Sequence, residues 1–181
     1  IPHTSFAAIE GMYERTITIN GLSKAFAMTG WRIGYLAAPE WIAKACNKVQ
    51  GQITSGTNAI AQRAAIAALK APKSKIQYMI DEFKKRSDLV LALLSEVEGL
   101  KVNVPEGAFY VFPDVSSFFG KTLRGRNIHN ATDFSLYLLE EAMVATVTGE
   151  AFGDANCIRI SYAASEKELR EAIRRIKESL A

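Results

Sequence analysis

The sequence is poor in cysteine and histidine. Only two cysteines and two histidines occur among its 181 residues. Cys46 and Cys157 lie in segments whose patterns predict a helix and a buried strand, so we expect core thiols and a reducing, cytoplasmic environment. His3 and His129 are not spaced like ligands, either to each other or to the cysteines. A metal site is therefore not expected.

Long apolar runs and charge clusters of one sign are also missing. No stretch is long and apolar enough to span a bilayer, and no signal peptide is recognisable. The formal net charge is only +3, with basic and acidic residues mixed along the chain. A nucleic-acid surface usually shows a basic cluster with interleaved aromatic residues, and none is present. We expect neither a membrane nor a nucleic acid as a partner.

The most informative segment is 20–35, which reads NGLSKAFAMTGWRIGY. The β-branched residues before it predict a strand, which Asn20-Gly21 ends in a turn. Lys24 would then lie on a loop just beyond the strand, where open α/β sheets bind their ligands. A lysine in such a place can form a Schiff base with an aldehyde, provided that its amine is partly unprotonated.

Other residues of this segment suit a phosphorylated ligand. Arg32 offers a planar fork of donors that matches a phosphate. Ser23 could add a hydroxyl contact, and Gly30 and Gly34 would let the backbone approach the ligand closely. The ordinary alternative is a solvated lysine with glycines in common turns, because short motifs match by chance often.

A second candidate is Arg159, which lies in the apolar segment 158–162. Strand alternation puts Arg159 and Ser161 on one face and the apolar side chains on the other. Such an arginine must reach solvent at a sheet edge or pair with an anion, because an unpaired buried charge costs roughly 3 to 5 kcal/mol. A bidentate guanidinium would suit a planar carboxylate. The residues alone leave both alternatives open.

Ser23-Lys24 followed by Thr-Gly-Trp-Arg-x-Gly-Tyr resembles the cofactor-lysine segment of class I aminotransferases, which are fold-type I enzymes that use pyridoxal 5′-phosphate. Arg159-x-Ser-Tyr resembles the segment whose arginine binds the substrate α-carboxylate. The segments 105–110 and 149–153 resemble shorter motifs of the same family, which we expect to shape and close the site. The likeness extends through most of the chain and names an aspartate-aminotransferase-like group.

The resemblance implies an enzyme that moves an amino group between an L-amino acid and a 2-oxo acid. Lys24 would be the Schiff-base residue and proton shuttle, Arg32 and Ser23 would contact the cofactor phosphate, and Arg159 would clamp the α-carboxylate. A homodimer with its site at the subunit interface is implied as well. Ser55 and Thr57 would approach the neighbouring subunit's cofactor.

Several features of the family pattern are absent from this chain. They include a glycine-rich phosphate loop, an aromatic ring that stacks on the cofactor, and an aspartate that pairs with its ring nitrogen. We therefore expect the C-terminal portion of an enzyme, with little or no activity alone. Gly21 also stands where some members carry a phosphate-binding serine. The amino acid that serves as donor is not deducible.

We expect an α/β fold in two parts. Residues 1–72 would be the tail of the large cofactor-binding domain, and residues 73–181 a long connecting helix with a small α+β domain. A Ser165–Glu168 capping box begins the last helix. The expected strands are 15–19, 33–37, 101–104, 109–112, 143–148 and 157–162; the expected helices are 40–50, 58–69, about 72–97, 132–141 and 165–180, with a loop at 118–130.

Two other functions remain open. The chain could belong to a transcription regulator whose aminotransferase-like domain senses the cofactor, which predicts a winged-helix segment upstream. It could also be a non-catalytic domain or a dimerisation fragment. Covalently bound cofactor absorbs visible light, so colour discriminates an enzyme or sensor from a non-catalytic fragment.

Overall fold

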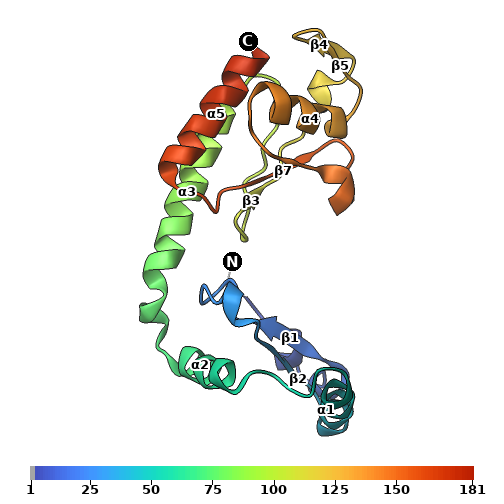
Figure 1. The fold of residues 1–181 in the computed structure, drawn as a ribbon, viewed down its shortest axis with the longest axis vertical. Coiled ribbons are helices and arrows are strands. Elements are labelled where there is room, and N and C mark those ends of the chain that lie inside the picture. Colours follow the sequence, from blue (N-terminus) through green and yellow to red (C-terminus); the bar gives the residue numbers. More distant parts are fainter. Residues whose placement is uncertain (1–2) are drawn as a thin grey trace. The chain divides into compact units, whose positions relative to one another are not determined.

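The computed structural model describes residues 3–181, which form two compact units (Figure 1). Unit 1 ends at Tyr78 and unit 2 is Met79–Ala181. The division falls in the first turn of the long helix α3 (Gln77–Ser95). The domain boundary expected at 72/73 stays a prediction for the whole protein.

Unit 1 is built around a β-hairpin and two helices. Strands β1 and β2 pair antiparallel, with Thr18 opposite Ala37 and Gly21 opposite Gly34. The loop that carries Lys24 therefore joins two strands of one hairpin. The elements of this unit are η1 (Phe6–Ala8), η2 (Tyr13–Arg15), β1 (Thr18–Gly21), η3 (Thr29–Trp31), β2 (Gly34–Ala37), α1 (Glu40–Thr54), α2 (Ala59–Lys70) and η4 (Lys73–Lys75).

Several expected boundaries in unit 1 were wrong. Asn20-Gly21 does not end the strand but pairs within β1, and a 3-10 turn follows Pro72 where a helix was expected to begin. The strand does not begin at Arg15, because Tyr13–Arg15 forms a 3-10 turn and the Thr16 hydroxyl donates to the Met12 carbonyl at 2.6 Å. Helix α1 continues beyond residue 50 to Thr54, and it ends where Ser55 takes a positive φ of 63°. The second helix was predicted correctly, and the Asn58 side chain caps it by accepting from a backbone N–H.

Unit 2 contains a small sheet of order β3-β7-β6, packed with helices. Both strand pairs are antiparallel, and β7 is the central strand. The elements after α3 are β3 (Tyr110–Val111), η5 (Ser116–Phe118), β4 (Lys121–Leu123), β5 (Arg126–Ile128), α4 (Ala131–Glu141), β6 (Val147–Thr148), η6 (Gly149–Phe152), β7 (Ile158–Ser161) and α5 (Glu166–Leu180).

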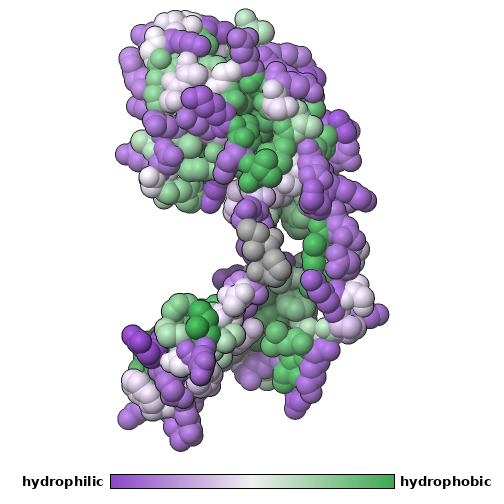
Figure 2. All heavy atoms as spheres, turned by 180° about the vertical axis from the view of Figure 1, so that it is seen from behind, coloured by the Kyte–Doolittle hydropathy of each residue, from purple (hydrophilic) through white to green (hydrophobic). Residues whose placement is uncertain are grey.

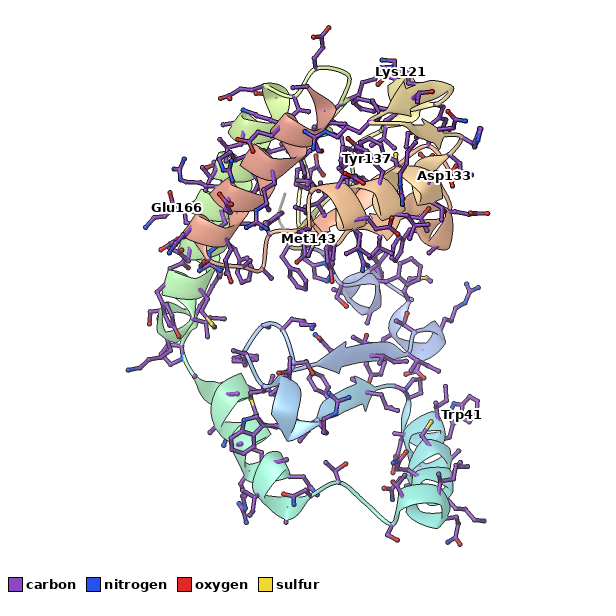
Figure 3. All side chains as sticks on the ribbon, turned by 45° about the horizontal axis from the view of Figure 1, so that its top comes forward. Trp41, Lys121, Asp133, Tyr137, Met143 and Glu166 are labelled. Carbon is purple, nitrogen blue, oxygen red and sulfur yellow. The ribbon has the colours of Figure 1, made fainter. Side chains whose placement is uncertain are left out.

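The core of unit 2 lies between α3, α4, α5 and the sheet. Phe134 on α4 is fully buried and stacks on Phe118, with ring centroids 4.8 Å apart. Tyr137, one turn further along α4, is buried as well, and its hydroxyl donates to the Ser179 carbonyl of α5 (Figure 3). This bond satisfies the polar end of a buried tyrosine. The aromatic side chains of α4 thus hold the unit together.

Helix starts in unit 2 were predicted better than its short strands. The capping box at Ser165 and Glu168 is confirmed, with both reciprocal hydrogen bonds present. The expected loop at 118–130 was wrong, because it contains the antiparallel hairpin β4–β5. Arg124 and Gly125 both take positive φ at its turn, as a tight hairpin requires, although only the glycine favours that conformation.

Three expected strands are shorter or missing. Of 109–112, only Tyr110–Val111 forms a strand. Lys101 makes only an isolated bridge with Asp114, so 101–104 is not a strand. Val104 is 75% exposed, whereas Val102 on the same face is partly buried against the core of unit 2. Of 143–148, only Val147 and Thr148 pair, and Met143 leaves the extended region with a φ of 55°.

The surface carries many apolar side chains (Figure 2). In unit 1, Ile19, Trp41 and Ile53 are each at least 70% exposed, and Trp41 projects outward from α1 (Figure 3). Across residues 3–181, no helix combines the length and the apolar character needed to cross a membrane.

Cys157 gives unit 2 a pH-dependent stability at alkaline pH. Burial raises the pKa of its thiol from 9.0 to about 11, helped by a hydrogen bond to Asp154 and by the charges of Asp154 and Asp114. Above about pH 9 the thiol ionises in the unfolded chain but stays protonated in the folded one. The contribution of this thiol to the free energy of unfolding is therefore fully present below about pH 9. It is lost as the pH rises towards 11.

We expect the free energy of unfolding of the wild type to fall more steeply than that of Cys157→Ala between about pH 9 and 11. Urea titrations at closely spaced pH values measure both curves. Parallel curves for the two proteins would show that the thiol does not cause the loss.

Candidate active site

The Lys24 loop is anchored by apolar side chains at both of its ends. Leu22 and Ile33 are buried, and so is Met28, which lies between them in the sequence. All three pack with Ala61 and Ala65 of α2. Because Leu22 is adjacent to β1 and Ile33 to β2, this small core fixes both ends of the loop to the hairpin and to α2.

Lys24 lies in a tight turn within this loop. The Ala27 N–H donates to the Lys24 carbonyl and the Phe26 N–H to the Leu22 carbonyl, both at 3.2 Å. The Lys24 residue is exposed, whereas Ser23 beside it is half-buried. The turn therefore holds the backbone while the lysine side chain extends from the anchored loop.

Arg32 lies at the other end of the loop in a strained backbone conformation. It has φ 49° and ψ 51°, the left-handed region that side chains other than glycine rarely adopt. Its Nη1 donates to the Thr29 carbonyl at 2.9 Å, which ties the guanidinium back to the 3-10 turn before it. Strained residues of this kind persist where the surroundings over-determine them, often at ligand sites.

A hollow of about 730 Å³ adjoins Arg32. It extends to the start of α2, where Thr57 and the capping residue Asn58 line it, and Gly30 lines it as well. Its volume is in the range of small-molecule sites. Ser23 and Lys24 are not among its lining residues. The structure thus brings Arg32 and Thr57 to one hollow and places Lys24 elsewhere on the same loop.

Gly34 has a structural role within the hairpin, and its expected approach to a ligand stays a prediction. A Cβ at this position would lie 2.9 Å from the Asn20 carbonyl oxygen, which faces it across the hairpin. The close approach that requires glycine is therefore between the two strands of the hairpin. Gly30 borders the hollow, and a Cβ at this residue would have no other atom within 4 Å. The space of the hollow beside Gly30 is therefore open.

Arg159 lies on the central strand of the unit 2 sheet. The predicted alternation is confirmed: Ile158 and Ile160 are buried on the other face, and Arg159 is half-buried. A central strand has no free edge, so the edge alternative does not apply. Within residues 3–181, no carboxylate forms an ion pair with this guanidinium. Lys24 and Arg32 belong to unit 1, whereas Arg159 belongs to unit 2.

Two aromatic residues beside Arg159 were not identified as site residues from the sequence. The Arg159 Cζ lies 4.4 Å from the centroid of the Tyr110 ring and 4.1 Å from that of the Phe152 ring. The segments 105–110 and 149–153 were expected to shape and close the site. The signal in the sequence was that Tyr110 and Phe152 lie in these two motif segments; their place beside Arg159 depends on strand pairing and on the η6 turn.

The acidic, histidine and cysteine side chains do not gather into a metal site in the part of the chain that the structure describes. No group of three or more such residues among residues 3–181 could hold an ion.

Comparison with known proteins gives concordant matches. The family model for aminotransferase class I and II matches residues 3–176. A bifunctional aspartate aminotransferase and glutamate/aspartate-prephenate aminotransferase of Petunia hybrida is 50% identical over 98% of this chain and 38% of its own length. An aspartate aminotransferase of Pinus pinaster is 48% identical, again over 98% of this chain and 37% of its own length.

A solved structure has the same fold. The crystal structure of the aspartate aminotransferase from Rhizobium meliloti matches with a TM-score of 0.90 and 47% identity, over 94% of this chain and 43% of that chain. The expected α/β fold of this family is thereby confirmed. This chain spans about two fifths of the length of the curated relatives it matches. The chain belongs to the aminotransferase class I and II family.

Proposed function

We propose that the protein containing this chain is a pyridoxal-phosphate-dependent aminotransferase. It would exchange an amino group between an L-amino acid and a 2-oxo acid. The family membership supports this proposal, because aspartate-aminotransferase-like members of the family depend on that cofactor. Aspartate is the first donor to test, since the names of several relatives include it.

The observation that carries the proposal is the anchored loop between β1 and β2. It bears an exposed lysine near one end and an exposed arginine at the other, while buried side chains fix both ends. An amine that can bond an aldehyde and a guanidinium fork that can grip a phosphate are the two donors that this cofactor needs. The hollow beside Arg32 leaves room for a small molecule.

The chain's own residues would divide the work as follows. Lys24 would hold the cofactor covalently through Nζ and, once released, would take the substrate α-proton on the same nitrogen and return it as a general base and acid. Arg32, with Ser23, would bind the phosphate, and Arg159 would bind the α-carboxylate through its planar fork. The cofactor, when bound, supplies an electron sink for the charge left by the departing proton.

A homodimer is part of the proposal. The exposed apolar side chains of α1, including Trp41 and Ile53, support coverage by further protein, because exposed apolar patches usually mark interaction surfaces. Sedimentation of the whole protein would measure its oligomeric state.

Covalent tagging tests the central claim. We expect the whole protein to turn yellow with added pyridoxal phosphate, and borohydride reduction followed by peptide mapping to place the added mass on Lys24. A colourless protein without a tagged lysine would overturn the proposal. A tagged protein that exchanges no amino group with any common amino acid would favour a cofactor-sensing domain.

A further inference from the structure

Arg159 projects from the face of the unit 2 sheet that carries Tyr110. Tyr110 on β3 pairs with Ser161 on β7, and Ser161 shares a strand face with Arg159 two residues away. Diagonal neighbours of this kind are within reach when one side chain is aromatic and the other is long. The pairing register therefore brings the Tyr110 ring to within 4.4 Å of the guanidinium carbon.

Phe152 reaches the same guanidinium from a different element. It ends the η6 turn, and its ring centroid lies 4.1 Å from the Arg159 Cζ. The turn is held tightly, because the Gly149 N–H donates to the Cys157 carbonyl at 2.7 Å. A Cβ on Gly149 would lie only 2.4 Å from that carbonyl oxygen. Phe112 packs edge-on against Phe152 at 6.4 Å, which supports the ring further.

We propose that Tyr110 and Phe152 are positioning residues that fix the guanidinium of Arg159 for a substrate carboxylate. Cations are attracted to the faces of aromatic rings, and arginine also stacks on them. The N–H groups lie in the guanidinium plane, so contact with ring faces restrains the cation and leaves its hydrogen-bonding fork available. A carboxylate side chain could also restrain the guanidinium, but it would occupy the fork that the substrate needs. Aromatic rings restrain the guanidinium and leave the fork unoccupied. The inference rests on the proposed role of Arg159.

The test uses the whole enzyme loaded with pyridoxal phosphate. Phe152→Leu and Tyr110→Leu keep apolar bulk but remove the ring faces. We expect each to raise KM by about 3- to 30-fold, the range that runs from exposed to desolvated cation–ring contacts. The increase should appear for both the amino donor and the 2-oxo acid, because both present a carboxylate, while kcat changes less than about threefold. Phe152→Tyr and Tyr110→Phe, which keep the rings, should restore KM to within about twofold.

A double substitution separates positioning from a general structural effect. In an Arg159→Gln background, which lacks the cation, Phe152→Leu should leave KM nearly unchanged, because coupled residues are not additive. Phe119→Leu, a half-buried residue elsewhere in unit 2, is the matched control and should leave KM at the wild-type value.

The outcomes distinguish this inference from the proposed function. If Arg159→Gln itself leaves KM unchanged, Arg159 is not the carboxylate residue and its role in the proposed function fails. If Arg159→Gln raises KM strongly but the leucine variants do not, only the positioning role is overturned. An equal effect of Phe152→Leu with and without Arg159 would also overturn it.

Discussion

We expect Lys24→Ala to abolish the proposed amino-group exchange of the whole protein. Loss of a general base alone costs roughly 10²- to 10⁴-fold in rate, and the covalent link to the cofactor is lost as well. We therefore expect kcat at or below the lower end of detection, with no yellow colour that survives dialysis. The measurement is a coupled transamination assay together with an absorbance spectrum of the dialysed protein.

Two controls define what the Lys24 result means. Lys24→Arg keeps a positive charge but should be equally inactive, because a guanidinium neither bonds the aldehyde nor gives up a proton. Lys48→Ala removes another exposed lysine of unit 1, on α1, and should keep wild-type activity. Substantial turnover by Lys24→Ala would refute the assigned role of this residue.

Phe134→Ala lowers the free energy of unfolding of unit 2 by about 3 to 5 kcal/mol, the usual cost of removing a large buried aromatic side chain. The ring is fully buried and contacts two others, with centroids 4.8 Å from Phe118 and 6.4 Å from Tyr137. Such a loss is a large part of the total stability of a typical domain, about 5 to 15 kcal/mol. Urea unfolding followed by circular dichroism measures it.

Leu136→Ala on the same helix is the matched control. Leu136 is 46% exposed, so we expect its replacement to cost much less than that of Phe134. If the two substitutions cost the same, α4 does not pack by the face that the structure shows.

The helices were accessible from the sequence because their signals are local, although α3 begins at Gln77 and not at Pro72 as expected. Asn58 and Ser165 precede apolar patterns of helical period, and each caps a helix in the structure. The β4–β5 hairpin was missed because its turn puts Arg124, a residue unfavourable in that conformation, at a positive φ. The strand expected at 101–104 failed because only Lys101 forms a bridge, with Asp114, and such pairing depends on residues elsewhere in the chain.

Some parts of the candidate site could be predicted from the sequence, and others could not. The segments around Lys24 and Arg159 could be singled out because their motifs resemble those of class I aminotransferases, whereas the residues alone left ordinary alternatives open. The hollow beside Arg32 could not be foreseen, because it also needs the start of α2, more than 20 residues away. The catalytic roles of Lys24, Arg32 and Arg159 stay predictions, which the tagging and kinetic experiments test.

The sequence by itself determined the family, the helices and the alternation that exposes Arg159 on one strand face, because each is encoded in neighbouring residues. Only the tertiary structure decided that β7 is central and that Tyr110 and Phe152 lie against Arg159. Strand order and the packing of aromatic side chains depend on contacts between residues far apart in the chain. The pattern of neighbouring residues does not predict such contacts.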